Sequence, residues 1–126
     1  MGGAGRAPRV LVIEDYDDAR EMYVEYLALS GYEVVAAEDG HAALRAANEA
    51  PPDLIVLDIA LPKLDGLSVL RALRSQARFS ATPVLTLSAS IEGDYEGHAL
   101  RAGATLALRK PLLPEDLMAA IRKTLK

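Results

Sequence analysis

The sequence predicts an α/β domain in which a parallel sheet is covered by helices on both faces. Short apolar runs alternate with helical patterns five times along the 126 residues. Three of these runs are apolar almost throughout, as expected for strands that are buried on both faces. Strands that alternate with helices form parallel sheets through right-handed crossovers. Because 51% of the residues are hydrophobic, the chain has enough apolar material for one core.

The expected strands share a length of five or six residues and a content rich in leucine or β-branched side chains. They are residues 9–13, 33–37, 53–57, 83–88 and 105–109.

The first two helices are predicted from apolar spacing and from the residues at their ends. Asp17 or Asp18 is expected to cap the first helix, which Gly31 follows. The second helix, 40–50, is expected to stop because two prolines follow it and cannot continue a helix.

Three further helices are expected over residues 65–76, 92–103 and 114–125. Asp65 can cap the first of these, and the last begins with proline and acids, as the helix dipole favours. The middle helix contains Gly93 and Gly97, each of which costs about 1 kcal/mol in a helix interior. We therefore expect it to be the loosest helix.

Composition limits the function classes. The net charge is −4 and cysteine is absent, which argues against disulfides, thiolate metal sites and a nucleic-acid or membrane partner. No apolar run is long enough for a membrane span or a signal peptide. We expect a flexible tail over residues 1–8 and one soluble, cytoplasmic domain over 9–126, with no output domain after it.

Polar side chains follow four of the five expected strands. Glu14 and Asp15 come after the first strand, Asp58 after the third, Ser88 ends the fourth, and Lys110 follows the fifth. Parallel α/β sheets bind ligands at the carboxyl ends of their strands. We therefore expect three carboxylates, a hydroxyl and an ammonium at one edge of the sheet, with the second strand at an outer position.

This set of groups predicts a magnesium-dependent phosphoryl acceptor. Two carboxylates about 4 Å apart repel by about 4 kcal/mol at an effective dielectric of 20. Three of them therefore need more positive charge than one lysine provides. Hard oxygen ligands favour Mg²⁺ or another small divalent ion. An aspartate beside such an ion and a lysine can accept a phosphoryl group. Asp58 would attack, while Lys110 and Ser88 stabilise the phosphoryl oxygens.

Each residue alone has an ordinary structural explanation. Asp15 fits a helix cap equally well, Ser88 a loop hydroxyl and Lys110 a surface charge. Only the arrangement of complementary groups at four strand ends favours a functional site.

At these residues the chain resembles the receiver domain of bacterial two-component response regulators. The resemblance covers about residues 8–126 and includes the acidic pair Glu14-Asp15, "LIVLDIALPKLDG", "TPVLTLSA" and "AGATLALRKP". It implies a flavodoxin-like fold with five helices and a five-stranded parallel sheet in the order 2-1-3-4-5.

The resemblance also implies a mechanism. Asp58 would take a phosphoryl group from the phosphohistidine of a histidine kinase or a histidine phosphotransferase. Glu14, Asp15, Asp58 and the backbone carbonyl of Ala60 would bind Mg²⁺. Ser88 and Lys110 would match the switch hydroxyl and the lysine of the family, and the peptide bond from Lys110 to Pro111 would be cis.

Signalling in that family passes to a protein partner through the fourth helix, fifth strand and fifth helix. The position three residues before the lysine usually carries Tyr or Phe, but here it is Ala107. The usual hydroxyl–aromatic coupling therefore cannot operate, and movement of the fourth helix is expected instead. Ala60 and Ser90 are small and are expected to leave the acyl phosphate open to water.

The resemblance leaves the form of the whole protein open. The chain can be a stand-alone regulator or a receiver from a larger regulator or hybrid kinase, and we expect a monomer or weak homodimer.

Three alternatives remain. A pseudo-receiver would bind partners without phosphorylation, which Ala107 leaves room for. A phosphohydrolase with an aspartyl nucleophile would need an acid at position 60 for general acid–base catalysis, so sustained turnover is not expected. A flavin-binding electron carrier needs a hydroxyl- and glycine-rich phosphate loop, whereas "EDYDD" would repel phosphate.

Overall fold

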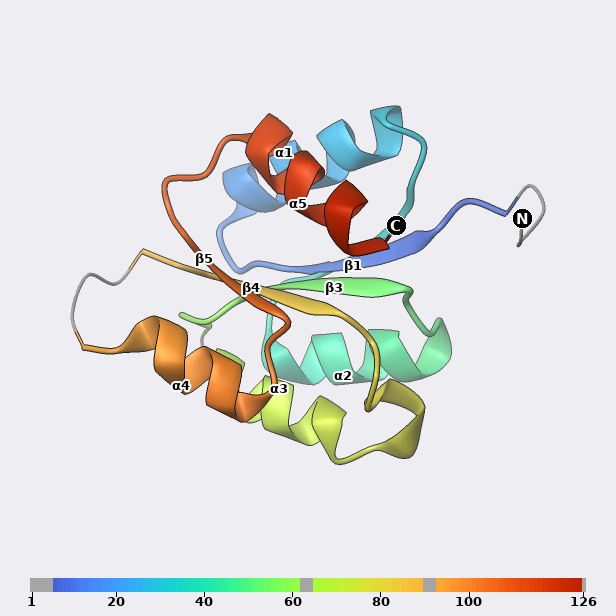
Figure 1. The fold of residues 1–126 in the computed structure, drawn as a ribbon. Coiled ribbons are helices and arrows are strands. Elements are labelled where there is room, and N and C mark those ends of the chain that lie inside the picture. The colour runs from blue at the N-terminus through green and yellow to red at the C-terminus, as the bar shows by residue number, and fades with distance from the viewer. Residues whose placement is uncertain (1–5, 62–64, 90–92, 126) are drawn as a thin grey trace.

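The computed structural model describes residues 6–61, 65–89 and 93–125. Within these residues, five parallel strands form one sheet in the order β2-β1-β3-β4-β5. Four α-helices connect the strands, and a fifth follows β5. The sheet lies between two helical layers, with α1 and α5 on one face and α2, α3 and α4 on the other (Figure 1). The predicted architecture and strand order are confirmed.

The observed elements follow the predicted ones closely. The strands are β1 (Arg9–Ile13), β2 (Glu33–Ala37), β3 (Leu54–Asp58), β4 (Val84–Ser88) and β5 (Leu106–Arg109). The helices are α1 (Asp17–Leu29), α2 (Gly40–Glu49), α3 (Gly66–Arg74), α4 (Tyr95–Ala102) and α5 (Pro114–Leu125), with a 3₁₀ turn at Ala77–Phe79. None of the helices in the described part of the chain combines the length and hydropathy that crossing a bilayer demands.

The alternation of side chains along the inner strands divides the core into two layers. Leu11 and Ile13 of β1 pack toward α2 and α3, while Val10 and Val12 pack toward α1 and α5. Every residue of β3 and β4 is buried, whereas β2 is partly exposed at the edge of the sheet. The inner strands β1, β3 and β4 thus give the residues at their ends a rigid support.

The expected cap of α1 is wrong. Asp17 and Asp18 both lie inside the first turn, and the N-cap residue is Tyr16, whose side chain makes no capping bond. Asp17 instead pairs with Arg20, so its carboxylate is not available to the helix end. The predicted cap of α3 is confirmed, because Asp65 Oδ1 accepts a hydrogen bond from Ser68 N at 3.0 Å.

The predicted start of the fourth helix is also wrong. Asp94 caps this helix by accepting a hydrogen bond from Gly97 N at 2.9 Å, and α4 begins at Tyr95. Gly93 precedes it with φ of +68°, so this glycine serves the approach to the helix and adds no cost to the interior. Gly97 alone of the two predicted glycines lies within α4.

Two residues of the predicted N-terminal tail, 1–8, contact the rest of the domain. Residues 1–5 lie outside the described residues, whereas Arg6 pairs with Asp53 at 3.3 Å and Pro8 O accepts a hydrogen bond from Glu33 N at 2.9 Å.

Arg74 joins the far ends of α3 and α4. Its guanidinium donates to the carbonyl oxygens of Phe79, Thr82 and Gly103 at 2.6–3.0 Å. Gly103 ends α4 with φ of +115°, and a Cβ there would lie 2.8 Å from Arg74 Cγ. The glycine therefore provides both the left-handed turn and the space that this arginine needs.

Replacing Arg74 should destabilise the fold. We expect Arg74→Ala to lower the free energy of unfolding by on the order of 3 kcal/mol, because three carbonyl groups lose a charged donor. Urea unfolding of this variant and of Arg71→Ala, whose side chain is exposed on the same helix, would test the prediction. Equal losses in the two variants would contradict it.

Candidate functional site

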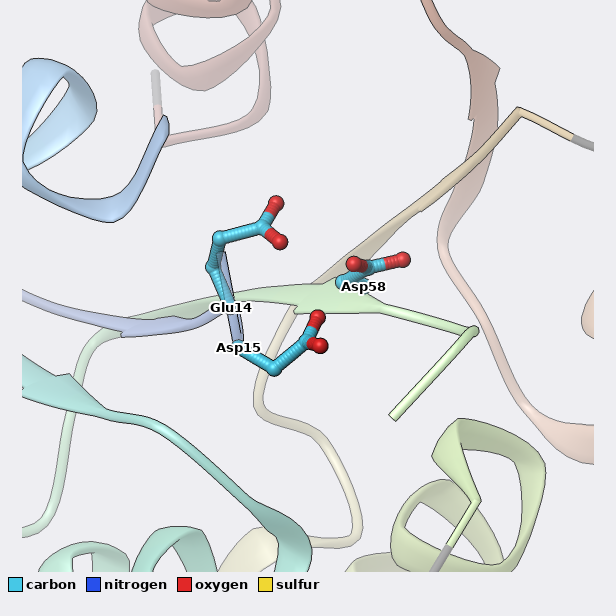
Figure 2. A group of neighbouring side chains, drawn as sticks. All are labelled: Glu14, Asp15 and Asp58. Carbon is cyan, nitrogen blue, oxygen red and sulfur yellow. The ribbon is translucent and has the colours of Figure 1, made fainter. Parts of the chain in front are cut away.

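Three carboxylates meet where β1 and β3 end. Glu14 follows β1, Asp15 comes next, and Asp58 is the last residue of β3. One oxygen from each lies within 4.8 Å of the others, and the three side chains point toward a common space (Figure 2). Glu14 is 2% exposed and Asp58 4%, whereas Asp15 is exposed to solvent. The predicted acidic cluster is therefore present in the structure.

Backbone contacts fix the two segments that carry these acids. Glu14 N donates to Ala37 O at 3.1 Å, and Glu14 Oε2 accepts from Tyr16 N at 3.2 Å. On the other segment, Asp58 Oδ1 accepts from Ala60 N at 3.1 Å. Gly66, the first residue of α3, packs so closely that a Cβ would lie 2.7 Å from Asp58 O.

Lys110 connects the end of β5 to the acids. Its Nζ lies 2.8 Å from Glu14 Oε1 and 3.3 Å from Asp58 Oδ2. The backbone supports this reach, because Lys110 N donates to Ser88 O at 2.9 Å and the peptide bond to Pro111 is cis, as predicted. Lys110 therefore links the end of β5 to side chains at the ends of β1 and β3.

The electrostatics of the cluster differ from one acid to the next. Burial and the neighbouring Glu14 carboxylate raise the pKa of Asp58 from 3.8 to about 6. Burial also acts to raise the pKa of Glu14, but hydrogen bonds from Lys110, Asp58 and the Tyr16 N–H outweigh it, and the pKa is lowered. Of these two acids, Glu14 is therefore the first to lose its proton, and Asp58 becomes ionised as well only near neutral pH.

Lys110 keeps its proton in this setting. Burial acts to lower the pKa of its ammonium, but the contacts with Glu14 and Asp58 outweigh burial, and the pKa is raised. One ammonium therefore faces three carboxylates. The remaining negative charge, carried by hard oxygen atoms within 4.8 Å of one another, fits a small divalent cation such as Mg²⁺.

Ser88 ends β4 beside this cluster. Its side chain is 4% exposed, and it borders a groove of about 490 Å³ whose lining also includes Ile59, Leu67 and residues of the first turn of α4. The sheet thus brings all five predicted side chains to one edge, with Ser88 at the α4 side. Of the small residues expected beside the acceptor, Ala60 is exposed, and Ser90 lies outside the described residues.

Sequence reasoning did not identify Arg20 as part of the site. Its guanidinium donates to the carbonyl oxygens of Glu14 and Asp15 at 2.9 and 3.4 Å and pairs with Asp17. It therefore holds the turn that carries two of the acids. The signal available in the sequence was a cation three residues after Asp17, which indicates an ordinary helix pair.

Comparisons with known proteins agree with this site. A family model described as the response regulator receiver domain matches residues 10–122. The transcriptional regulatory protein PrrA of Mycobacterium tuberculosis is 45% identical over 120 residues, which cover 95% of this chain and 51% of PrrA. The alkaline phosphatase synthesis transcriptional regulatory protein PhoP of Bacillus subtilis is 37% identical over 118 residues, which cover 94% of this chain and 48% of PhoP. The chain thus spans about half the length of these curated relatives.

Solved structures give the same result. The chemotaxis protein CheY4 of Vibrio cholerae superposes with a TM-score of 0.89 at 32% identity, covering 94% of this chain and 98% of CheY4. The receiver domain of sensor histidine kinase PA1611 from Pseudomonas aeruginosa, solved with a magnesium ion coordinated in its active site cleft, gives 0.86 at 28% identity and covers 95% and 98% of the two chains. Sequence, fold and site agree, and the chain belongs to the response regulator receiver domain family.

Proposed function

We propose that this chain is a phosphorylation switch in a two-component phosphorelay. Asp58 accepts a phosphoryl group from the phosphohistidine of a sensor histidine kinase or a histidine phosphotransferase, and the phosphorylated chain signals to a protein partner. The cluster of Glu14, Asp15 and Asp58 with Lys110 carries this proposal. In the proposed organisation, the receiver domain comprises residues 9–126 and residues 1–8 form a tail.

The donor set fits Mg²⁺ as the cofactor. Glu14, Asp15, Asp58 and the backbone carbonyl of Ala60 would hold the ion, which supplies positive charge to neutralise the acids and the transferring group. The solved receiver of PA1611 is described with magnesium in its active site cleft, which supports the same assignment here.

The residues of the chain then provide the transfer chemistry. Asp58 loses its proton, and a carboxylate oxygen attacks phosphorus in line with the bond to the histidine nitrogen. That P–N bond breaks, and its electron pair leaves with the imidazole. Lys110 Nζ, 3.3 Å from Asp58 Oδ2, is close enough to neutralise an oxygen of the new acyl phosphate. Ser88 is assigned as a hydrogen-bond donor to another oxygen.

Exposed leucines support the proposed output face. Leu100 of α4, Leu106 of β5 and Leu113 just before α5 are 51%, 38% and 59% exposed. We assign the downstream protein partner to this α4–β5–α5 face. The curated relatives are named transcriptional regulators, but the net charge of −4 disfavours direct nucleic-acid binding by this chain. We propose a cytoplasmic monomer or weak homodimer.

The site favours a switch over a turnover enzyme. An aspartyl-phosphate phosphohydrolase needs a second acid near the nucleophile to activate water. At position 60 the chain carries alanine, whose N–H contacts Asp58 Oδ1 at 3.1 Å and which offers no acid. A pseudo-receiver remains the alternative that a phosphorylation experiment separates from the proposal.

Asp58 should be the phosphorylated residue. After incubation with Mg²⁺ and acetyl phosphate, we expect the intact mass of the wild type to increase by one phosphoryl group, because Asp58 is the acid that Lys110 and the metal ligands surround. Asp58→Asn should gain nothing, whereas Asp65→Asn, which removes an exposed carboxylate at the start of α3, should react like the wild type. Equal labelling of Asp58→Asn and wild type would place the acceptor elsewhere, and an unlabelled wild type would favour the pseudo-receiver.

Ionised Asp58 should destabilise the metal-free fold. Because the pKa of Asp58 is raised to about 6, the folded chain binds this proton more tightly than the unfolded chain between about pH 4 and pH 6. The contribution of Asp58 to the free energy of unfolding therefore falls as pH rises through this window. With magnesium chelated, we expect Asp58→Asn to be more stable than wild type at pH 7.5 by on the order of 2 kcal/mol.

Urea unfolding at several pH values would measure this difference. The gain should shrink severalfold by pH 4, where the folded wild type holds the proton on Asp58. A gain that does not change between pH 4 and pH 7.5, or a loss at pH 7.5, would contradict the electrostatic account of the site.

A further inference from the structure

The core beside Ala107 contains an aromatic side chain from another element. Ala107 lies opposite Thr86 in the register of β4 and β5, and it packs against the core cluster that contains Tyr95. Tyr95 is the first residue of α4, and its side chain is 7% exposed. An aromatic ring therefore does fill this part of the core, but it comes from the helix and not from β5.

The hydroxyl of Tyr95 ties α4 to two strands. It donates to the backbone carbonyl of Leu108 at 3.0 Å and lies 2.7 Å from Thr86 Oγ1. Either hydroxyl can be the donor in this second bond, and Thr86 Oγ1 also donates to the carbonyl oxygen of Leu106 at 3.5 Å. Arg109 covers the ring, with its guanidinium carbon 5.6 Å from the ring centroid. The start of α4 is thus fixed to β4 and β5 through one side chain.

Thr86 leads from this ring to the phosphoacceptor site. Thr86 and Ser88 are two residues apart on β4, so their side chains lie on the same face of the sheet. Ser88 and Tyr95 also line the same groove. A displacement of Ser88 toward a phosphoryl group would therefore act on the end of β4 and on the groove wall that Tyr95 forms.

We propose that Tyr95 is the positioning residue that couples the phosphoacceptor site to α4 in this chain. The inference rests on the proposed function. Because the ring belongs to the helix, a change in its packing against Thr86 is also a change in the position of α4. A second ring at position 107 would compete for the space beside Thr86, which accounts for the alanine there.

The ring signals of the two histidines of the chain can report movement of α4 by NMR. His98 lies on the exposed side of α4 and His41 near the start of α2, so their ring signals in NMR report on a responding and a distant helix. Beryllofluoride with Mg²⁺ serves as a stable mimic of the acyl phosphate. In the wild type, we expect the mimic to shift the backbone amide signal of Ala60, beside the acceptor, and the ring signal of His98, with little change at His41.

Tyr95→Phe keeps the ring and removes the hydroxyl. We expect the Ala60 shift to stay at its wild-type size, because this variant does not touch the acceptor, while the His98 shift becomes at least twofold smaller. Thr86→Val removes the hydrogen bond between the two side chains but leaves the bond from Tyr95 to Leu108, so its reduction of the His98 shift should be no larger than that of Tyr95→Phe. The double variant should lose no more than Tyr95→Phe alone, since that variant already lacks the shared hydrogen bond.

Tyr32→Phe is the matched control, because Tyr32 precedes β2 at the opposite edge of the sheet, and it should respond like the wild type. A full His98 shift in both Tyr95→Phe and Thr86→Val would overturn the role of Tyr95 while leaving phosphoacceptance intact. If the mimic does not move the Ala60 signal in the wild type, the proposed function fails and this inference fails with it.

Discussion

The contact of one ammonium with two buried carboxylates determines the properties of this edge of the sheet. Lys110 Nζ lies 2.8 Å from Glu14 and 3.3 Å from Asp58, and both acids are almost completely buried. Two like charges about 4 Å apart repel by about 4 kcal/mol at an effective dielectric of 20. A single lysine cannot balance Glu14, Asp15 and Asp58 together. Burial, together with the neighbouring Glu14 carboxylate, raises the pKa of Asp58. The charge imbalance also leads us to expect affinity for a divalent cation.

The parallel sheet makes this concentration of charge possible. Its inner strands β1, β3 and β4 are buried on both sides, and they all end at the same edge. The polar groups therefore stand on rigid supports, while the connections that leave this edge carry Arg20 and Ala60. On the far side of Ser88, α4 is joined to β4 and β5 through Tyr95. The proposed phosphoacceptor site and the helix proposed to respond to it are thus neighbours in the fold but depend on different elements.

Much of this arrangement could be predicted from local sequence patterns. Glu14, Asp58, Ser88 and Lys110 each stand at the end of an apolar run, and parallel topology brings such positions to one edge. The order of the strands followed from the family resemblance that those residues carry. Most helix bounds followed from patterns of apolar and capping residues, with the cap of α1 and the start of α4 as the exceptions.

The remaining features depend on particular side-chain contacts, some local and some between distant segments. Asp17 looks like a cap until its partner Arg20 is seen. Nothing in the pattern around Tyr95 indicates that its hydroxyl reaches Leu108, 13 residues away. Likewise, the pKa of Asp58 depends on how deeply three chain segments bury it together, which a linear motif does not specify.

Calorimetric titration with Mg²⁺ tests the central claim, that excess negative charge at residues 14, 15 and 58 makes a divalent cation part of the site. The account predicts one ion per wild-type chain and, near pH 6, proton release on binding, because Asp58 is partly protonated there. Asp15→Asn should bind at least about tenfold more weakly, and Asp18→Asn should bind like the wild type. Wild-type protein that shows no binding at millimolar Mg²⁺, or an Asp15→Asn variant with unchanged affinity, would contradict the account.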